Sequence, residues 1–237
     1  MAAAVARSRE VALNNDNAVP SREEVFACYQ QLRAISKRHN DKLTQLISTG
    51  SLLQQARRLG LARGKTLLLE DMDELAYVFD LAIHTAPPSR TRVIDRYAQA
   101  AKFAPGSDEA RVLEAMQAAQ FAILEVVRRH ETAGLIMLDV YRDIEVWLVD
   151  IGLEASLRDG EILATRLYTP DRFSITAGVC IPFDLDILDS ALERMPQRLL
   201  KRDRSVIDDR RFAEAIYRGA LDAGLMDKLT FLDLSAA

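Results

Sequence analysis

The chain has 237 residues, of which 49% are hydrophobic and 28% are charged, and its formal net charge at neutral pH is −4. These values are typical of a folded globular protein and exclude a fibrous repeat or a wholly disordered chain. The acidic balance argues against indiscriminate binding of nucleic-acid phosphates unless basic residues cluster locally. No apolar stretch approaches the roughly 18 residues that a membrane span requires, so we expect no membrane span.

The N-terminal residues lack a positively charged start followed by a continuous apolar run, which a secretion signal would need. We expect residues 1–20 to form a disordered leader and the protein to be cytoplasmic. The only two cysteines, Cys28 and Cys180, lack the CxxC spacing of zinc and redox sites. They are expected to be buried free thiols in a reducing compartment.

Helical patterning extends over residues 21–120. Ser21 and Glu24 stand at capping-box spacing, so a long helix is predicted to start there. Its apolar residues recur at three- and four-residue steps, and the helix is predicted to end at Gly50. Four further helices are predicted in the segments 51–64, 71–84, 89–101 and 107–119.

The hydrophobic period changes from 3.6 to 2 at Phe121. Strands this short, with apolar residues on both faces, tend to curl into a small barrel whose outer face is covered by helices. The predicted fold class is therefore α+β: a small five-stranded antiparallel β-barrel over residues 121–183, flanked by N-terminal helices (21–120) and C-terminal helices (184–237). The five predicted strands are 121–129, 134–142, 144–150, 161–168 and 173–181.

A basic segment accompanies the C-terminal helices, which are predicted at 184–195 and 209–225. Residues 194–211 carry seven Lys or Arg against three Asp. A solvated helical face is the usual meaning of such a run. Because small barrels often bind RNA, contact with RNA or DNA is the functional alternative. The residues that would make this contact are Arg198, Lys201, Arg202 and Arg204.

Three carboxylates, Asp139, Asp143 and Asp150, border the second and third predicted strands. Grouped acids can hold a divalent cation or serve hydrolysis, which makes a metal-dependent hydrolase one hypothesis. In the structural alternative, Asp139 pairs with Arg166 or Arg142, and the other two acids occupy a turn and a strand end, as Asp commonly does. The structural interpretation is favoured.

Trp147 and Arg166 are the candidate binding residues within the strands. Trp147 is expected in the core or at the seam between sheet and helices, because an indole buries a large area. An exposed Trp147 would instead mark a binding surface. Arg166 shares a strand face with apolar residues and must find an acceptor such as Asp139 or Asp150. Recognition of an anion is the functional alternative.

Motifs for catalysis or cofactor binding are absent from the sequence. The run from Gly60 to Thr66 has three residues between its glycines, one fewer than a phosphate-binding loop needs, and it follows a helical pattern. The three histidines have no second ligand at metal spacing, and no nucleophile elbow occurs. We therefore expect no cofactor, no bound metal and no catalytic residue.

The central part of the chain, roughly residues 60–184, resembles a known protein family. That family consists of bacterial proteins of unknown function with a helical N-terminal part and a small β-rich module. The resemblance implies this fold but assigns no catalytic role. Related modules sometimes precede a cysteine-rich zinc-binding motif called SEC-C, and no such motif follows in this sequence, so the resemblance implies no metal site. The motifs that carry it are "PGSDEA" at 105–110, "WLVDIGLEAS" at 147–156, "LATRL" at 163–167 and "TAGV" at 176–179.

The favoured functional hypothesis is a non-enzymatic module that recognises another protein through the barrel loops or the helical surface. It follows from the apolar patterning of both strand faces and the lack of catalytic motifs. Nucleic-acid association through residues 194–211 and a hydrolase built on Asp139, Asp143 and Asp150 are the alternatives. A homo-oligomer also stays open, because the long N-terminal helix could pair with its copy.

Overall fold

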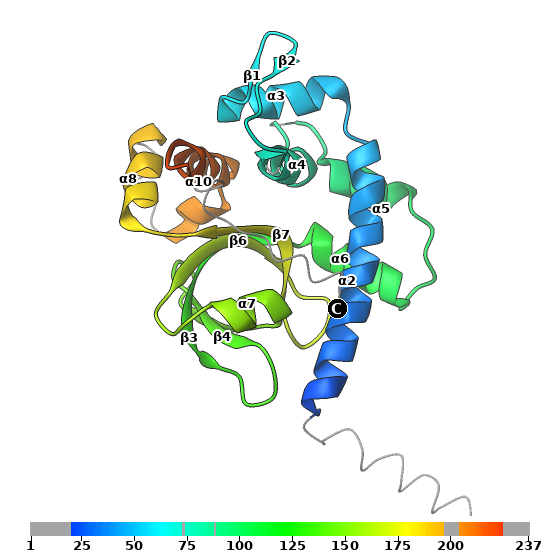
Figure 1. Cartoon of the computed structure of the whole chain (residues 1–237). Coiled ribbons are helices and arrows are strands. Elements are labelled where there is room, and N and C mark those ends of the chain that lie inside the picture. The colour runs from blue at the N-terminus through cyan, green and yellow to red at the C-terminus, as the bar shows by residue number, and fades with distance from the viewer. Residues whose placement is uncertain (1–19, 73, 88, 197–203, 225–237) are drawn as a thin grey trace, which may run out of the picture.

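A curled, five-stranded antiparallel sheet with helices packed on its outer face forms the body of the protein (Figure 1). The computed structural model describes residues 20–72, 74–87, 89–196 and 204–224. The predicted leader, residues 1–20, lies outside these ranges except for Pro20. Within the described ranges, no helix is both long enough and apolar enough to span a bilayer.

The longest helix, α2 (Arg22–Gln45), begins at the predicted capping box. The Ser21 hydroxyl accepts the Glu24 backbone N–H at 3.3 Å, and the Glu24 carboxylate accepts the Ser21 N–H at 2.8 Å. The predicted end at Gly50 is wrong. A second cap at Ser48, whose hydroxyl accepts a backbone N–H three residues further on, starts a new helix before that glycine.

The new helix, α3 (Thr49–Leu59), ends at Gly60, whose φ of 84° is a left-handed conformation that glycine adopts without strain. A helix end was predicted near Gly60 and Gly64; the helix ends at the first of these glycines, and the residues that follow form a short hairpin. The remaining elements of the N-terminal part are β1 (Ala62–Arg63), β2 (Thr66–Leu67), α4 (Glu74–His84), α5 (Val93–Ala100) and α6 (Asp108–Gln117).

The prediction of a five-stranded antiparallel sheet is confirmed. The strand order is β5-β4-β3-β6-β7, and every neighbouring pair is antiparallel. The period of two that begins at Phe121 sends alternate side chains to opposite faces of the sheet. The strands are β3 (Gln120–Arg129), β4 (Leu135–Asp139), β5 (Ile144–Leu148), β6 (Ile162–Tyr168) and β7 (Ile175–Pro182).

The sheet is not closed into a barrel, so the predicted barrel over residues 121–183 is wrong. The edge strands β5 and β7 do not pair along their length: an isolated parallel bridge joins Leu148 of β5 to Ser174, the residue before β7, with backbone hydrogen bonds of 2.7 and 3.0 Å. Beyond this bridge the chain leaves β5, because Asp150 caps a short helix that was not predicted, α7 (Ile151–Ser156). A strand that turns into a helix here cannot continue to pair with β7.

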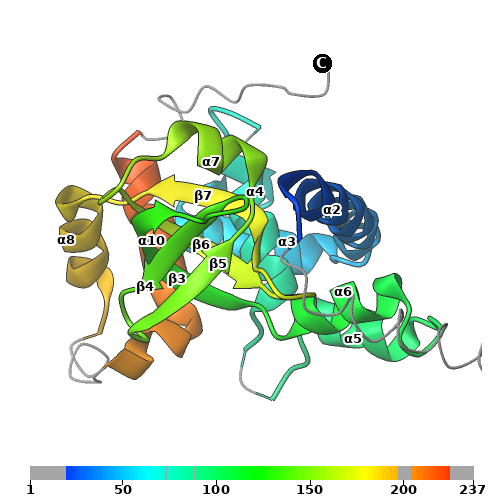
Figure 2. The same ribbon diagram turned by 90° about the horizontal axis from the view of Figure 1, so that it is seen from below.

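Apolar side chains fill the inside of the curl and cover its outer face, as expected from the two-sided pattern. The inner cluster includes Leu124, Met137 and Leu163, and Leu153 and Leu157 from the α7 region pack against it. Figure 1 shows α7 lying across the open side of the curl. A second cluster joins the sheet to α2, α5 and α6, which lie together on one side of the molecule (Figure 2).

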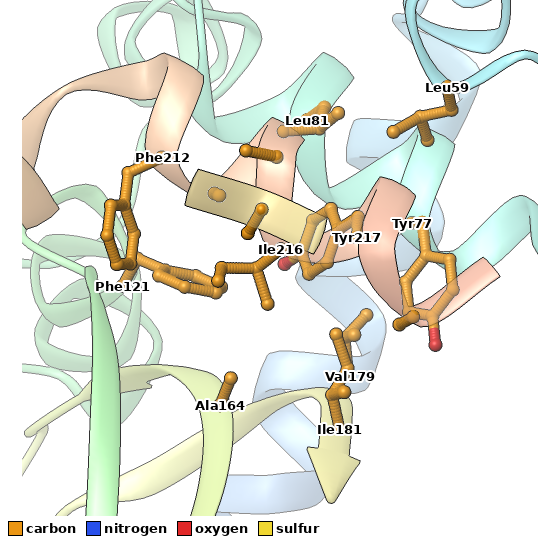
Figure 3. Close-up of a cluster of buried hydrophobic side chains, with 14 of the residues drawn as sticks. Leu59, Tyr77, Leu81, Phe121, Ala164, Val179, Ile181, Phe212, Ile216 and Tyr217 are labelled. Carbon is orange, nitrogen blue, oxygen red and sulfur yellow. The ribbon is translucent and has the colours of Figure 1, made fainter. Parts of the chain in front are cut away.

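The C-terminal helices complete the cover of the outer face. Figure 3 shows side chains of the last helix, Phe212 and Tyr217, near Phe121 of β3 and Tyr77 of α4. The rings of Tyr217 and Tyr77 stack with their centroids 4.9 Å apart. The C-terminal elements are α8 (Leu185–Arg194), the 3-10 helix η1 (Arg204–Asp208) and α10 (Arg210–Asp222).

Replacing Gly134 by alanine is expected to lower the free energy of unfolding by more than about 1 kcal/mol. Gly134 has a φ of 80°, and an added Cβ would lie 2.3 Å from the Leu148 carbonyl oxygen. Gly106 is the matched control, because its φ is 78° but an added Cβ would meet nothing within 4 Å. Urea unfolding should show a larger loss for Gly134→Ala than for Gly106→Ala, and equal losses would contradict the importance of the close approach.

Candidate functional site

The basic segment, residues 194–211, is only partly described. Among its described arginines, Arg194 pairs with Asp222, and Arg211 pairs with Asp209 at 2.8 Å. Nucleic-acid binding by this segment therefore stays a prediction. The residues on which it depends lie outside the described ranges: Arg198, Lys201, Arg202 and the side chain of Arg204.

Asp139, Asp143 and Asp150 have separate structural surroundings. The buried Asp139 carboxylate forms a 2.7 Å ion pair with Arg142, one of its two predicted partners, and accepts two backbone N–H groups. Asp143 lies in the β4–β5 turn with a φ of 59°, whereas Asp150 caps α7 and accepts the Tyr29 hydroxyl at 3.2 Å. No three metal-ligating side chains gather in the part of the chain that the structure describes. The geometry therefore does not favour the hydrolase hypothesis.

Trp147 lies half-buried at the edge of the cluster that joins the sheet to α2 and α6. Its indole N–H donates to the Ala133 carbonyl at 2.8 Å. Its ring stacks on His130 with the centroids 4.0 Å apart and meets the edge of the Phe173 ring. These contacts fasten the β3–β4 turn to β5, so the indole has a packing role at this seam.

Arg166 pairs with Asp80, a residue that the sequence analysis did not consider. Its Nε and Nη2 donate to the two carboxylate oxygens at 2.8 and 2.9 Å, and the Tyr217 hydroxyl donates to the same carboxylate at 2.7 Å. The predicted partners Asp139 and Asp150 are wrong. One signal was available: Asp80 is a lone acid in the middle of the apolar run of α4, where a buried carboxylate needs a cation.

The network of Asp80, Arg166 and Tyr217 joins α4, β6 and α10 through one buried ion pair. Burial by itself would raise the pKa of Asp80, but the Arg166 charge and the hydrogen bonds from Arg166 and Tyr217 lower it below its ordinary value. Asp80 and Arg166 are each only 6% exposed. Because the guanidinium is already bound to a protein carboxylate at two of its nitrogens, recognition of an external anion is not favoured.

His84 lies beside this network at the C-terminal end of α4. It is buried, and its Nδ1 has no hydrogen-bond partner among the described residues. Burial, reinforced by the Arg166 charge, lowers the pKa of His84 to about 3, so the imidazole is neutral at physiological pH. His84 borders a polar cleft of about 190 Å³ that contains arginines but also Asp208 and Asp209. This mixture of charges favours no particular class of ligand.

An apolar groove of about 1010 Å³ lies where α7, the ends of β6 and β7, and the start of α8 meet. We call it the α7–α8 groove. None of the predicted site residues lines it. Its apolar walls include Leu153, Leu157, Ile162, Phe183, Leu185 and Leu188.

Helix positions explain the two walls of the groove. Leu153 and Leu157 are four residues apart in the α7 region, and Leu185 and Leu188 are three apart in α8, so each pair lies on one helix face. Asp184 determines the start of α8, because its carboxylate accepts a backbone N–H of the first turn at 3.0 Å. Leu185 is 75% exposed, so the groove is open to solvent.

The polar groups that line the groove include one thiol and two carboxylates. Cys180 lines it, but burial raises the pKa of this thiol to about 11, so the reactive thiolate is scarce at neutral pH. Among the described residues, the lining contains the carboxylates Glu161 and Asp184 but no Lys, Arg or His.

This groove was not predicted from the sequence. The only signal was in α8, which carries apolar residues on two sides. Ile187 and Ala191 are buried in the core, whereas Leu185 and Leu188 lie on another face of the same helix. Apolar residues in excess of one buried face can indicate a second contact surface.

A family model matches residues 23–225, a span that contains the sheet and the helices on both sides of it. The chain belongs to DUF7986, a family of unknown function. The predicted resemblance to a family without an assigned activity is confirmed, and the bacterial source stays a prediction. No curated protein and no solved structure matches the chain. The α7–α8 groove lies wholly inside the span that matches DUF7986.

Asp80→Asn is expected to lower the free energy of unfolding of this DUF7986 protein by roughly 3–5 kcal/mol, because Arg166 stays buried without its counter-charge. Glu145→Gln is the control. It breaks an ion pair with Arg128 in which both side chains are 54% exposed, so solvent screening makes its effect small. Urea denaturation measures both variants. If the loss at Asp80 is no greater than at Glu145, the buried pair does not have the role assigned to it.

The neutral His84 is expected to make the protein less stable in mild acid. Its pKa of about 3 in the folded protein lies below the ordinary value of 6.5, so between these limits the unfolded chain binds a proton that the folded protein does not. Stability should therefore fall as the pH drops below about 6.5, by up to about 1.4 kcal/mol per pH unit. His84→Gln should make the fall shallower.

Urea midpoints of both proteins at about pH 7.5 and about pH 5 measure this effect. Asp80 does not interfere, because its carboxylate is ionised in the folded and the unfolded chain above its ordinary pKa. The same pH dependence in His84→Gln as in the unchanged protein would show that this histidine is not responsible.

Proposed function

We propose that this DUF7986 protein is a non-enzymatic, cytoplasmic protein-interaction module that binds a segment of a partner protein in the α7–α8 groove. The observation that carries the proposal is the groove itself, which has a volume of about 1010 Å³, apolar walls and an opening to solvent at Leu185. Exposed apolar surface of this kind marks interaction sites.

Burial of apolar side chains can supply the binding free energy. Leu185 is 75% exposed and Val140 is 40% exposed, and both line the groove. Covering such a side chain completely contributes roughly 1.5–3 kcal/mol. Ile187, between the two groove leucines of α8, is fully buried in the core, so this wall is already held in place and binding requires little ordering.

A protein segment fits the groove better than a compact small molecule. Small-molecule sites usually orient the ligand with a few converging polar groups. Three of the polar side chains in this groove, Ser156, Glu161 and Asp184, each bond to the backbone of their own helix or turn. Recognition must therefore come mainly from apolar contacts along the walls, as in helix-in-groove complexes.

The cysteines support the cytoplasmic part of the proposal. Cys28 and Cys180 are both free thiols. Burial raises the pKa of each thiol, which also slows its oxidation. Free thiols persist in the reducing cytoplasm, whereas exported proteins commonly pair theirs.

A photo-crosslinking amino acid placed at Leu185 in the native host is expected to form an adduct with a protein segment. Met72 is the matched control, because it is 70% exposed and does not line the groove. Adding Leu188→Gln to the Leu185 crosslinker should reduce the yield, because it removes part of an apolar wall. The crosslinked peptides are identified by mass spectrometry.

Equal yields at Leu185 and Met72 would contradict the proposal, and so would a lipid as the adduct at Leu185. An adduct with a second copy of the chain would assign the groove to self-association and thereby answer the open question of a homo-oligomer.

A further inference from the structure

Two acidic segments border the α7–α8 groove. Residues 158–161 and 184–189 carry five carboxylates and one arginine, a net charge of −4 that equals the formal charge of the whole chain. All six of these charged side chains are exposed. The carboxylates, called the acidic border below, are Asp159, Glu161, Asp184, Asp186 and Asp189.

The acidic border has no cationic partner among the described residues. Glu161 and Asp184 accept backbone N–H groups, those of Arg158 and Ile187. Some surface carboxylates elsewhere in the protein do meet an arginine, which neutralises them. Examples are Asp95 with Arg92, Asp108 with Arg111, and Glu145 with Arg128. The groove is therefore an apolar floor beside negative charge that no Lys or Arg of the described residues compensates.

An apolar floor with an acidic border favours an occupant that has apolar side chains on one face and positive charge on another. Apolar side chains of the occupant enter the groove, while its Lys or Arg residues meet the border carboxylates. Such exposed charge pairs add mainly to the association rate and to specificity. The same border repels fatty acids and anionic lipid surfaces, although both would find the floor apolar. Charge therefore distinguishes among occupants that the floor alone would accept.

We infer that the α7–α8 groove binds a basic amphipathic helix of a partner protein. The apolar face of that helix lies against Leu157, Leu185 and Leu188, with anchors at positions i, i+4 and i+7, and its basic residues lie beside Asp186 and Asp189. This inference rests on the proposed function, because it names the chemistry of the occupant of the same groove.

Three labelled peptides of about 18 residues, long enough for about five helical turns, test the inference on the full chain. All share one leucine stripe at helical spacing, and their polar positions are all Lys, all Gln or all Glu. Fluorescence anisotropy should show the Lys peptide binding at least about tenfold more tightly than the Gln peptide, and the Glu peptide most weakly. The advantage of Lys over Gln should shrink as salt rises from about 50 mM to about 300 mM.

Charge-reversal variants separate the acidic border from the overall charge. Asp186→Lys with Asp189→Lys should abolish the preference for Lys over Gln, because it removes two exposed carboxylates next to Leu185 and Leu188 in α8. The matched pair, Asp41→Lys with Glu70→Lys, changes the net charge equally at exposed positions that do not line the groove. It should keep the preference. Circular dichroism and thermal unfolding check that both variants fold.

Two outcomes would overturn the inference and leave the proposed function standing. In the first, the Lys and Gln peptides bind equally and Leu188→Gln weakens both, so the floor binds without selecting charge. In the second, no peptide binds, although the crosslinker at Leu185 captures a partner segment that is not basic.

Equal weakening by the two charge-reversal pairs would also overturn the inference, because it would show general attraction to an acidic protein. If no peptide binds and crosslinking shows no preference for Leu185, the proposed function fails together with the inference.

Discussion

Arg166 of β6 meets Asp80 of α4 within the outer helical layer, and the Tyr217 hydroxyl of α10 donates to the same carboxylate. Three elements that are distant in sequence thus share one buried pair of charges. An ion at this depth carries a penalty of several kcal/mol unless a counter-charge and hydrogen bonds compensate it. The pair is therefore satisfied only when α4 and α10 are both docked on the sheet, and the stack of Tyr77 on Tyr217 depends on the same docking.

The docked layer also explains why an apolar groove remains at one end of the curl. Gly219 of α10 lets the Ile187 carbonyl of α8 approach closely, since an added Cβ would lie 3.1 Å from that oxygen. The face of α8 that carries Ile187 therefore packs against α10, whereas Leu185 and Leu188, on another face, line the groove. The opposite wall of the groove comes from the α7 region. Because the chain forms α7 after β5 and does not continue as a strand, Leu157 lies at the end of the curl and lines the groove.

Two of the carboxylates that were candidates for catalysis or metal binding have structural roles. Asp139 is bound by Arg142, and Asp150 caps α7, so both carboxylates stabilise local structure. What remains for a partner is an apolar floor and an acidic border, both within the span that defines the family. In the binding role that we propose, a surface of this composition provides affinity through burial and specificity through charge.

Many elements could be predicted from the sequence: the cap at Ser21, the change of period at Phe121, the five antiparallel strands and most of the helices on either side. The β1–β2 hairpin and α7 were not predicted. Caps and periods are properties of neighbouring residues, so they can be predicted without knowing the rest of the fold. Three features become visible only once the chain is folded: the sheet stays open, Arg166 meets Asp80, and leucines of α7 and α8 form one groove. A hydrophobic pattern shows that a side chain will leave water, but the segment against which it packs depends on which distant parts of the chain meet.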